Sequence, residues 1–353
     1  MEIAVVSFET VYHRDAETNR RLHRILQLLQ DQDHEIDVYC ARFWEGDLPT
    51  FERDGITYHG LAPDLESQGK FLAKLPTELA RTNADVVHLS ADPAKQVLAA
   101  RSGTTLARVP TVLEWYGAGG VPNDWWSRRA AKWADRIVTP SELVGTWVRE
   151  LGADGDDVDV VPNPIDVARI RSVDPGDPVD VVYARDLDED ANLESLFLAL
   201  AELRDRDWSA TVIGDGPERD AYERLASDLR IDDRVTFAGD CSLEDRIATY
   251  RGARVFVQTA EHCVFPTEML WALTAGCVGI VEYHTDSSAH ELVEGWDRGF
   301  RTTSAEELAD AIVDAGQLEQ RDFDDRFADY DEATVRDRYL TIYRSVQESA
   351  GLF

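Results

Sequence analysis

Short apolar runs rich in valine and isoleucine recur along the whole chain, and most are separated by segments with helical spacing of their apolar residues. The first series of runs covers residues 3–7, 35–39, 56–58, 86–90, 112–115 and 136–138, and the second covers 179–183, 210–213, 235–238, 255–258 and 278–283. Alternation of this kind is typical of parallel sheets with helices on both faces. We therefore expect an α/β protein with doubly wound parallel sheets.

The length and the break between the two series predict two domains. A chain of 353 residues with 44% hydrophobic content is long enough to form two separate cores. A polar stretch at residues 174–178 precedes the second series. We expect a first Rossmann-like domain at 1–168, a second at 169–330, and a C-terminal segment at 331–353 whose helix crosses back to the first domain.

The charge of the chain excludes one class of partner. A formal net charge of −32 repels the phosphate backbone of nucleic acids, so we expect no nucleic-acid binding. Lysine is rare, because the positive charge is almost all arginine; the lysines are Lys70, Lys74, Lys95 and Lys132. An acidic, lysine-poor surface suits a cytoplasm at molar salt, which screens its self-repulsion. We expect an extreme halophile as the source, with an acidic mesophile as the alternative.

Composition also limits the cofactors and the location. The four cysteines form no C-x-x-C pair, which argues against a disulfide framework or a zinc site. The chain begins with a strand pattern and lacks a basic, apolar leader. The longest apolar run, residues 269–281, is too short to span a bilayer. We expect a cytoplasmic protein without a metal or cofactor, located in the cytoplasm or at the inner membrane surface.

The stretch from Glu261 to Gly276 combines the features of an anion site and a sugar site. A β-branched run ends just before Glu261, Pro266 ends the following loop, and Thr267 is expected to cap a helix. The unpaired N–H groups and the dipole at a helix start favour a phosphate. Glu261 and Glu268 can accept hydrogen bonds from sugar hydroxyls. The combination predicts a nucleotide-sugar site.

The same stretch resembles the donor-site signature of family-four retaining glycosyltransferases of the GT-B fold, and the acidic composition indicates a haloarchaeal type. Glu261 matches the first acid of the signature, and residues 272–276 match its helix end. The spacing departs from the family, because Glu261 and Glu268 enclose six residues where the family has seven. Counting back from Gly276 places Trp271 at the second acid. The resemblance implies two Rossmann-like domains that face a cleft.

Two further segments of the second domain carry the resemblance. Gly214, Asp215 and Gly216 follow a strand and match the second-domain signature, and we expect them to shape the substrate site. Arg185 also lies at a strand end, where the family has an arginine and then a lysine that hold the donor diphosphate. The lysine is absent here, and residues 188–190 are acidic. The alternative for Arg185 is a surface ion pair with one of these acids.

Cations and aromatic residues of the first domain suggest other contacts. We expect Arg14 to meet the phosphate of a donor or acceptor, and we expect Arg21 and Arg24 to face solvent. On a helix, Trp126 and Trp133 share one face while basic residues cover another, which predicts peripheral membrane contact through Trp125, Trp126 and Trp133. Packing in the core is the alternative for these tryptophans.

The resemblance implies a metal-independent, retaining glycosyltransferase of the hexosyltransferase type. Its partners would be a nucleotide-sugar donor and a glycan or lipid-phosphate acceptor. The expected catalytic residues are Glu261 and Arg185, and the expected substrate-binding residues are Arg14, Gly214, Asp215, Gly216, Phe265, Pro266, Thr267, Glu268 and Glu291. Two alternatives are a nucleotide-sugar epimerase or hydrolase of the same fold and a degenerate, non-catalytic sugar-nucleotide-binding subunit.

Overall fold

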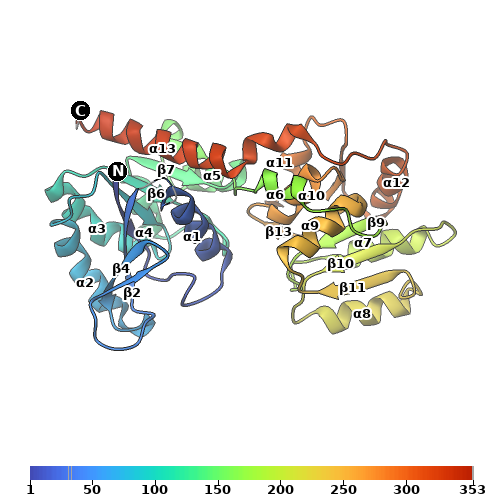
Figure 1. The fold of residues 1–353 in the computed structure, drawn as a ribbon, viewed down its shortest axis with the longest axis horizontal. Helices are drawn as coiled ribbons and strands as arrows, with labels where there is room; N and C mark the ends of the chain where they lie inside the picture. Colours follow the sequence, from blue (N-terminus) through green and yellow to red (C-terminus); the bar gives the residue numbers. More distant parts are fainter. Residues whose placement is uncertain (31, 33, 352–353) are drawn as a thin grey trace. The chain divides into compact units, whose positions relative to one another are not determined.

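The computed structural model describes residues 1–30, 32 and 34–351 of the chain. These residues divide into two compact units (Figure 1). Unit 1 comprises Met1–Asn163 together with Ala333–Phe353, and unit 2 comprises Pro164–Glu332. Each unit is built on a parallel or almost wholly parallel sheet covered by helices, so the expected α/β class is confirmed.

Unit 1 contains an eight-stranded sheet in the order β3-β4-β2-β1-β5-β6-β7-β8. Its strands are β1 (Glu2–Val6), β2 (Glu35–Ala41), β3 (Thr50–Arg53), β4 (Ile56–Ala62), β5 (Val86–Ser90), β6 (Thr111–Glu114), β7 (Arg136–Thr139) and β8 (Val158–Val160). Only β3 runs antiparallel to its neighbour among the described strands of this sheet. Its helices are α1 (Glu17–Gln30), η1 (Leu65–Ser67), α2 (Gln68–Leu79), α3 (Ala94–Ala107), α4 (Trp125–Ala131), α5 (Glu142–Glu150), η2 (Gly155–Asp157) and α13 (Glu332–Ser349).

The C-terminal helix α13 belongs to the core of unit 1. Its buried residues Val335 and Tyr343 share an apolar cluster with Ile25 of α1 and with Val112 of β6. Residues four or eight apart on a helix lie on one face, which explains how α13 presents a continuous apolar stripe to the sheet. The first and last segments of the chain therefore fold into the same unit.

Unit 2 contains a six-stranded parallel sheet in the order β11-β10-β9-β12-β14-β16 and a short pair, β13 with β15. Its strands are β9 (Val179–Ala184), β10 (Ala210–Ile213), β11 (Val235–Gly239), β12 (Ala253–Gln258), β13 (His262–Cys263), β14 (Val278–Glu282), β15 (Asp286–Ser287) and β16 (Gly299–Thr302). Its helices are α6 (Val167–Ser172), α7 (Leu193–Glu202), α8 (Arg219–Asp228), α9 (Leu243–Gly252), α10 (Thr267–Thr274), α11 (His290–Val293), α12 (Ala305–Ala315) and η3 (Asp325–Tyr330).

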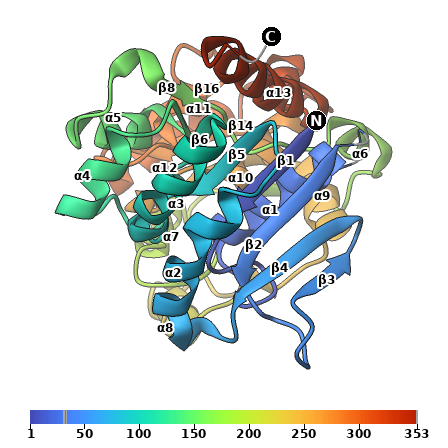
Figure 2. The same cartoon turned by 90° about the vertical axis from the view of Figure 1, so that its left-hand side faces the viewer.

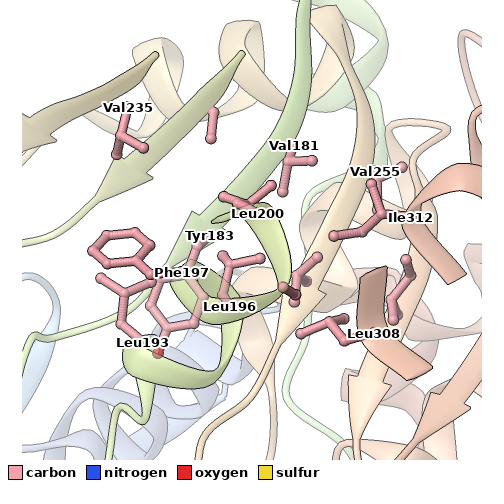
Figure 3. Close-up of a cluster of buried hydrophobic side chains, with 14 of the residues drawn as sticks. Val181, Tyr183, Leu193, Leu196, Phe197, Leu200, Val235, Val255, Leu308 and Ile312 are labelled. Carbon is pink, nitrogen blue, oxygen red and sulfur yellow. The ribbon is translucent and has the colours of Figure 1, made fainter. Parts of the chain in front are cut away.

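Both faces of the unit 2 sheet are buried, as the continuous apolar runs predict. Val181 and Tyr183 of β9 point into a cluster with α7 and α12, which Figure 3 shows. Val182 and Ala184 of the same strand point into a second cluster on the opposite face, with residues of α9 and α10. Successive side chains of a strand alternate between faces, so one strand supplies both cores.

Within the described residues, no helix has both the length and the apolar character needed to cross a bilayer.

Candidate functional site

Three neighbouring strands of unit 2 end in the segments that the sequence singled out. Gly214 follows β10, Arg185 follows β9, and Glu261 lies three residues after β12. These strands are adjacent and parallel, so their carboxyl ends lie at one edge of the sheet. The strand order reverses between β9 and β12, because β10 and β11 extend to one side and β12 and β14 to the other. Ligands of doubly wound sheets bind outside such a reversal point.

Arg185 lies at this reversal point with its guanidinium against the Glu261 loop. Its Nη1 donates to the carbonyl of His262 at 3.2 Å, and its Nη2 donates to Oδ2 of Asp188 at 3.4 Å. The side chain of Arg185 is 20% exposed, so it is fixed at the surface and still reaches solvent. Arg185 therefore forms the ion pair with Asp188 that the sequence analysis gave as an alternative, and it also lies beside the loop of Glu261.

The loop that follows Arg185 is held by hydrogen bonds to β9 and to the turn after β10. The buried hydroxyl of Tyr183 donates to the carbonyl of Ala191 at 2.6 Å, and the Tyr183 side chain lies next to Leu193 in Figure 3. The amide of Leu187 donates to the carbonyl of Asp215 at 2.8 Å. Burial raises the pKa of the Tyr183 hydroxyl well above its usual range, so it remains a donor. These contacts fix the position of the Arg185 backbone.

Gly214 and Gly216 must be glycines because the backbone of this loop passes too close to them to leave room for a Cβ atom. Gly214 has φ +120°, and a Cβ there would lie 2.0 Å from the carbonyl oxygen of Arg185. A Cβ at Gly216 would lie 2.3 Å from the carbonyl oxygen of Leu187. Asp215, between them, accepts from the Arg219 guanidinium at 3.3 Å. The glycine turn thus packs against the backbone of the loop that carries Arg185.

Glu261 lies beside the Arg185 loop with an exposed side chain. Its amide donates to the carbonyl of Asp190 at 3.0 Å, which joins the loop after β12 to the loop after β9. The segments that follow Glu261 and precede Glu291 are also joined, because β13 pairs with β15. Ser288 adds two bonds, from its amide to the carbonyl of Cys263 and from its hydroxyl to the carbonyl of Val264, both at 2.8 Å.

Helix α10 begins where the sequence predicts, although its cap differs. Pro266 is the residue before the helix, Thr267 is the first helical residue, and Pro266 makes no side-chain capping bond. The expectation that Thr267 caps the helix is therefore wrong. Phe265 and Pro266 are buried, and Phe265 packs in an apolar cluster with Tyr330 of η3 nearby. These two buried residues therefore anchor the end of the Glu261 loop in the core of unit 2.

Glu268 is engaged inside unit 2. Its Oε1 accepts from the Arg246 guanidinium at 2.7 Å, and its Oε2 accepts from the Tyr250 hydroxyl at 2.5 Å. Both carboxylate oxygens are thus bonded to α9, and the side chain is 24% exposed. These bonds join α10 to α9, and the expected role of Glu268 in accepting hydrogen bonds from sugar hydroxyls stays a prediction.

The structure adds polar residues to this edge that the sequence reading missed. Nδ2 of Asn192 donates to the carbonyl of Thr259 at 3.0 Å and lies 3.4 Å from both Oε2 of Glu282 and Nε2 of His284. Glu282 is the last residue of β14, the strand next to β12. An acid at the end of an otherwise apolar run was the available signal. Among the described residues, no group of three or more His, Cys, Asp and Glu side chains gathers closely enough to hold a metal ion.

Two arginines of unit 1 that the sequence analysis discussed, Arg14 and Arg21, are each paired with an acid, one at the surface and one in the core. Arg14 is bonded to Glu9 through two nitrogens, with Nε to Oε1 at 2.6 Å and Nη2 to Oε2 at 3.0 Å, and its side chain is 68% exposed. A substrate phosphate would therefore compete with Glu9. Arg21 is almost fully buried, where it pairs with Glu114. The expectation that Arg21 faces solvent is wrong.

Unit 1 also has a hollow of ≈ 580 Å³ that lies away from the expected chemistry. Thr111 and Arg136, which begin β6 and β7, line it together with Trp133 and Ser345. It thus lies at the amino ends of the strands, opposite to the edge where doubly wound sheets bind ligands. We do not assign the candidate site to it.

Comparison with known proteins supports the fold and the class of protein. A family model described as Glycosyltransferase Family 4 matches residues 18–169, and one described as Glycosyl transferases group 1 matches residues 165–332. No curated protein sequence matches the chain.

Three solved structures share the fold at low identity. A glycosyltransferase of Rickettsia africae has 14% identity and a TM-score of 0.79, with 98% of each chain covered. HepE of Anabaena in complex with UDP has 16% identity and a TM-score of 0.70, with 100% of each chain covered. A sucrose-phosphate synthase of Thermosynechococcus elongatus has 15% identity and a TM-score of 0.69, covering 100% of this chain and 98% of the other.

Proposed function

Because the chain belongs to the glycosyltransferases of the GT-B fold, we propose that it transfers a hexosyl group from a nucleotide-sugar donor to a glycan or a lipid-linked acceptor. The proposal includes retention of configuration, independence from a metal ion, and a location in the cytoplasm at the inner membrane surface. One observation carries it: Arg185 lies at the reversal point of the unit 2 sheet, with its guanidinium against the loop of Glu261.

The proposed donor site lies at the carboxyl edge of the unit 2 sheet. Arg185 would hold the diphosphate by two parallel hydrogen bonds, and the N-terminus of α10 would add peptide N–H groups and its dipole. Glu261, whose side chain is exposed beside Arg185, would accept hydrogen bonds from sugar hydroxyls. HepE of Anabaena has been crystallised with UDP-glucose, which supports a donor of this chemical class.

The reaction would break the bond between the anomeric carbon and the diphosphate oxygen. The acceptor oxygen forms its bond on the same face of the sugar, and its proton passes to the departing diphosphate. The contribution of the protein is then to position both reactants and to stabilise the negative charge on the diphosphate as it leaves. No side chain needs to form a covalent bond to the sugar.

The negative charge around Arg185 is unusual for a site that binds an anionic diphosphate. Arg185 already pairs with Asp188, and Asp186, Glu189 and Asp190 lie in the same loop. A diphosphate must therefore displace or share the Asp188 contact. This acidic surrounding favours a second candidate, a sugar-nucleotide-binding subunit without turnover.

Turnover separates these candidates. The full chain is incubated in molar KCl with UDP-, GDP- and dTDP-sugars, with and without glycan and lipid-phosphate acceptors, and release of the nucleoside diphosphate is measured. Acceptor-dependent release with an α-linked product from an α-linked donor supports the proposal. Release without an acceptor identifies an epimerase or hydrolase, and binding without release identifies the non-catalytic subunit.

A further inference from the structure

The lysines of this acidic chain lie on, or directly after, three neighbouring helices of unit 1: Lys70 and Lys74 on α2, Lys95 on α3, and Lys132 directly after α4. Helix α3 packs against both α2 and α4, and Figure 2 shows the three on the side that faces the viewer. These helices and the residue that follows α4 contain one acid, Glu78, whereas the whole chain has 68 acids against 36 basic residues. Their basic residues, all exposed, are Lys70, Lys74, Lys95, Arg101, Arg128, Arg129 and Lys132. We call this surface the cationic face.

Exposed apolar side chains lie on the same face. Trp125 is 63% exposed, Trp126 is 41% exposed and Leu106 is 75% exposed. The two indole rings meet edge to face with centroids 4.7 Å apart, and Nζ of Lys95 lies 5.6 Å from the Trp126 ring. Tryptophan beside lysine and arginine is the composition of segments that rest at a membrane interface.

Local structure fixes the tryptophans in this exposed position. Oδ1 of Asp124 accepts from the amide of Ser127 at 2.7 Å and so caps α4, which makes Trp125 its first residue. Arg128 and Arg129 occupy the last turn, where the helix dipole favours cations. Trp133 is different: it is partly buried, and the Arg101 guanidinium lies 6.0 Å from its ring centroid. The exposed anchors are therefore Trp125 and Trp126.

We infer that the cationic face docks unit 1 on an anionic lipid bilayer. Charge complementarity selects this occupant, because the rest of the chain is strongly acidic and is repelled by the same lipids. At molar salt the screening length falls to about 3 Å. Distant acids then no longer repel the lipid headgroups, whereas lysines in direct contact with the headgroups retain part of their attraction. Insertion of the exposed indoles is apolar and is not screened.

The inference rests on the proposed function in one respect: a lipid-linked acceptor gives the docking its purpose. The two remain separable, because the cationic face lies in unit 1, whereas the proposed donor site lies in unit 2. Nucleoside diphosphate release with a water-soluble acceptor reports on the proposed function alone. Vesicle binding reports on the cationic face alone.

The test is flotation of the full chain with vesicles of phosphatidylcholine alone or mixed equally with phosphatidylglycerol, in 0.15 M and 2 M KCl. We expect binding to the mixed vesicles only, reduced by about tenfold or more at 0.15 M KCl in the variant K95E/K132E. The matched control is R206E/R224E, which reverses two exposed cations of unit 2 and should bind as wild type does. W125A/W126A should lose binding at both salt concentrations.

Circular dichroism and sedimentation accompany each variant, so that loss of fold or self-association is detected. Equal binding to neutral and mixed vesicles would overturn the inference, as would equal losses in K95E/K132E and R206E/R224E. Absence of wild-type binding to both vesicles would also overturn it. A wild-type dimer that dissociates in W125A/W126A would assign the face to a second copy of the chain instead.

Discussion

Arg21 and Glu114 form an ion pair in the core of unit 1, with Nε of Arg21 2.6 Å from Oε1 of Glu114 and side chains only 1% and 3% exposed. Tyr339 of α13 donates to Oε2 of Glu114 at 2.7 Å and accepts from Arg21 at 2.8 Å. Arg21 also donates to Oδ1 of Asn163 and to the carbonyl of Val161. This network joins α1, β6 and α13, and it explains why the C-terminal helix belongs to unit 1.

Replacing Arg21 should therefore destabilise unit 1. Arg21→Met keeps most of the apolar length but leaves the Glu114 carboxylate buried without its cation. Breaking one side of a buried ion pair costs about 3–5 kcal/mol. Urea titration followed by circular dichroism measures the loss. The control is Arg20→Met, because Arg20 is exposed and pairs with Asp15 at the surface, so its loss should change the free energy of unfolding by less than about 1 kcal/mol. Equal effects would contradict the role of the network.

The same pair predicts a dependence of stability on pH. Burial alone would raise the pKa of the Glu114 carboxyl, but the Arg21 guanidinium, His88 and the Tyr339 hydroxyl together outweigh burial and lower the pKa from 4.5 to about 2. A lowered pKa in the folded state stabilises the fold above pH 4.5, and this stabilisation is lost as the pH falls towards 2. The free energy of unfolding of wild type should exceed that of Glu114→Gln by on the order of 3 kcal/mol near neutral pH, and the difference should shrink below pH 4.5. A constant difference down to pH 2.5 would contradict the assignment.

Much of the fold could be predicted from the sequence because the runs in its strands are continuous and β-branched. The strand at Val86–Ser90 and the one at Ala210–Ile213 have the predicted bounds. Two of the strands that were not predicted lack that signal: Thr50–Arg53 is mostly exposed and polar, and Gly299–Thr302 has a single buried residue. Such strands form because a neighbouring strand offers a hydrogen-bonding edge, which local composition does not reveal.

The candidate site could be predicted less completely. The positions of Arg185 and Glu261 could be predicted because each follows an apolar run, and strand ends gather at one edge of a parallel sheet. The partners of Glu268 and Arg21 could not be found this way. Tyr250 lies 18 residues before Glu268, and Glu114 lies 93 residues after Arg21. Whether an acid or a guanidinium is exposed or paired depends on contacts between elements that are distant in sequence.

Gly214→Ala should weaken donor binding without abolishing the fold. The new Cβ would meet the carbonyl oxygen of Arg185 at 2.0 Å, so the backbone that carries the guanidinium must shift. Gly295→Ala is the matched control, because Gly295 also has positive φ, +66°, but nothing lies within 4 Å of its added Cβ. Each variant should lose on the order of 1–3 kcal/mol of stability from its backbone conformation, and Gly214→Ala should lose more than the control because its Cβ meets backbone atoms. Only Gly214→Ala should raise the KM for the donor, and an unchanged KM would contradict this role of the turn.

Asp188→Asn should strengthen donor binding. The substitution removes the carboxylate that pairs with Arg185 at 3.4 Å and retains an oxygen for the amide of Asp190, which donates to Oδ1 of Asp188 at 3.1 Å. A partly exposed ion pair is worth up to about 1 kcal/mol, so the KM for the donor should fall by roughly two- to fivefold. Glu189→Gln makes the same change of net charge at an exposed neighbour. An equal decrease of the donor KM in both variants would show that the lower net negative charge, and not the loss of the Asp188–Arg185 ion pair, causes the effect.

The most direct measurement of the central claim is calorimetric titration of UDP, GDP and dTDP into wild type, Arg185→Met and Arg171→Met in molar KCl. Arg171 is an exposed arginine of unit 2 that pairs with Asp325 at 2.9 Å, so its replacement removes the same charge elsewhere. Hydrogen bonds to a charged group contribute about 1.5–3 kcal/mol, so Arg185→Met should bind the preferred nucleotide roughly 10- to 150-fold more weakly than wild type. Arg171→Met should bind it as wild type does. Equal affinities in all three proteins would contradict the proposal that Arg185 holds the donor diphosphate.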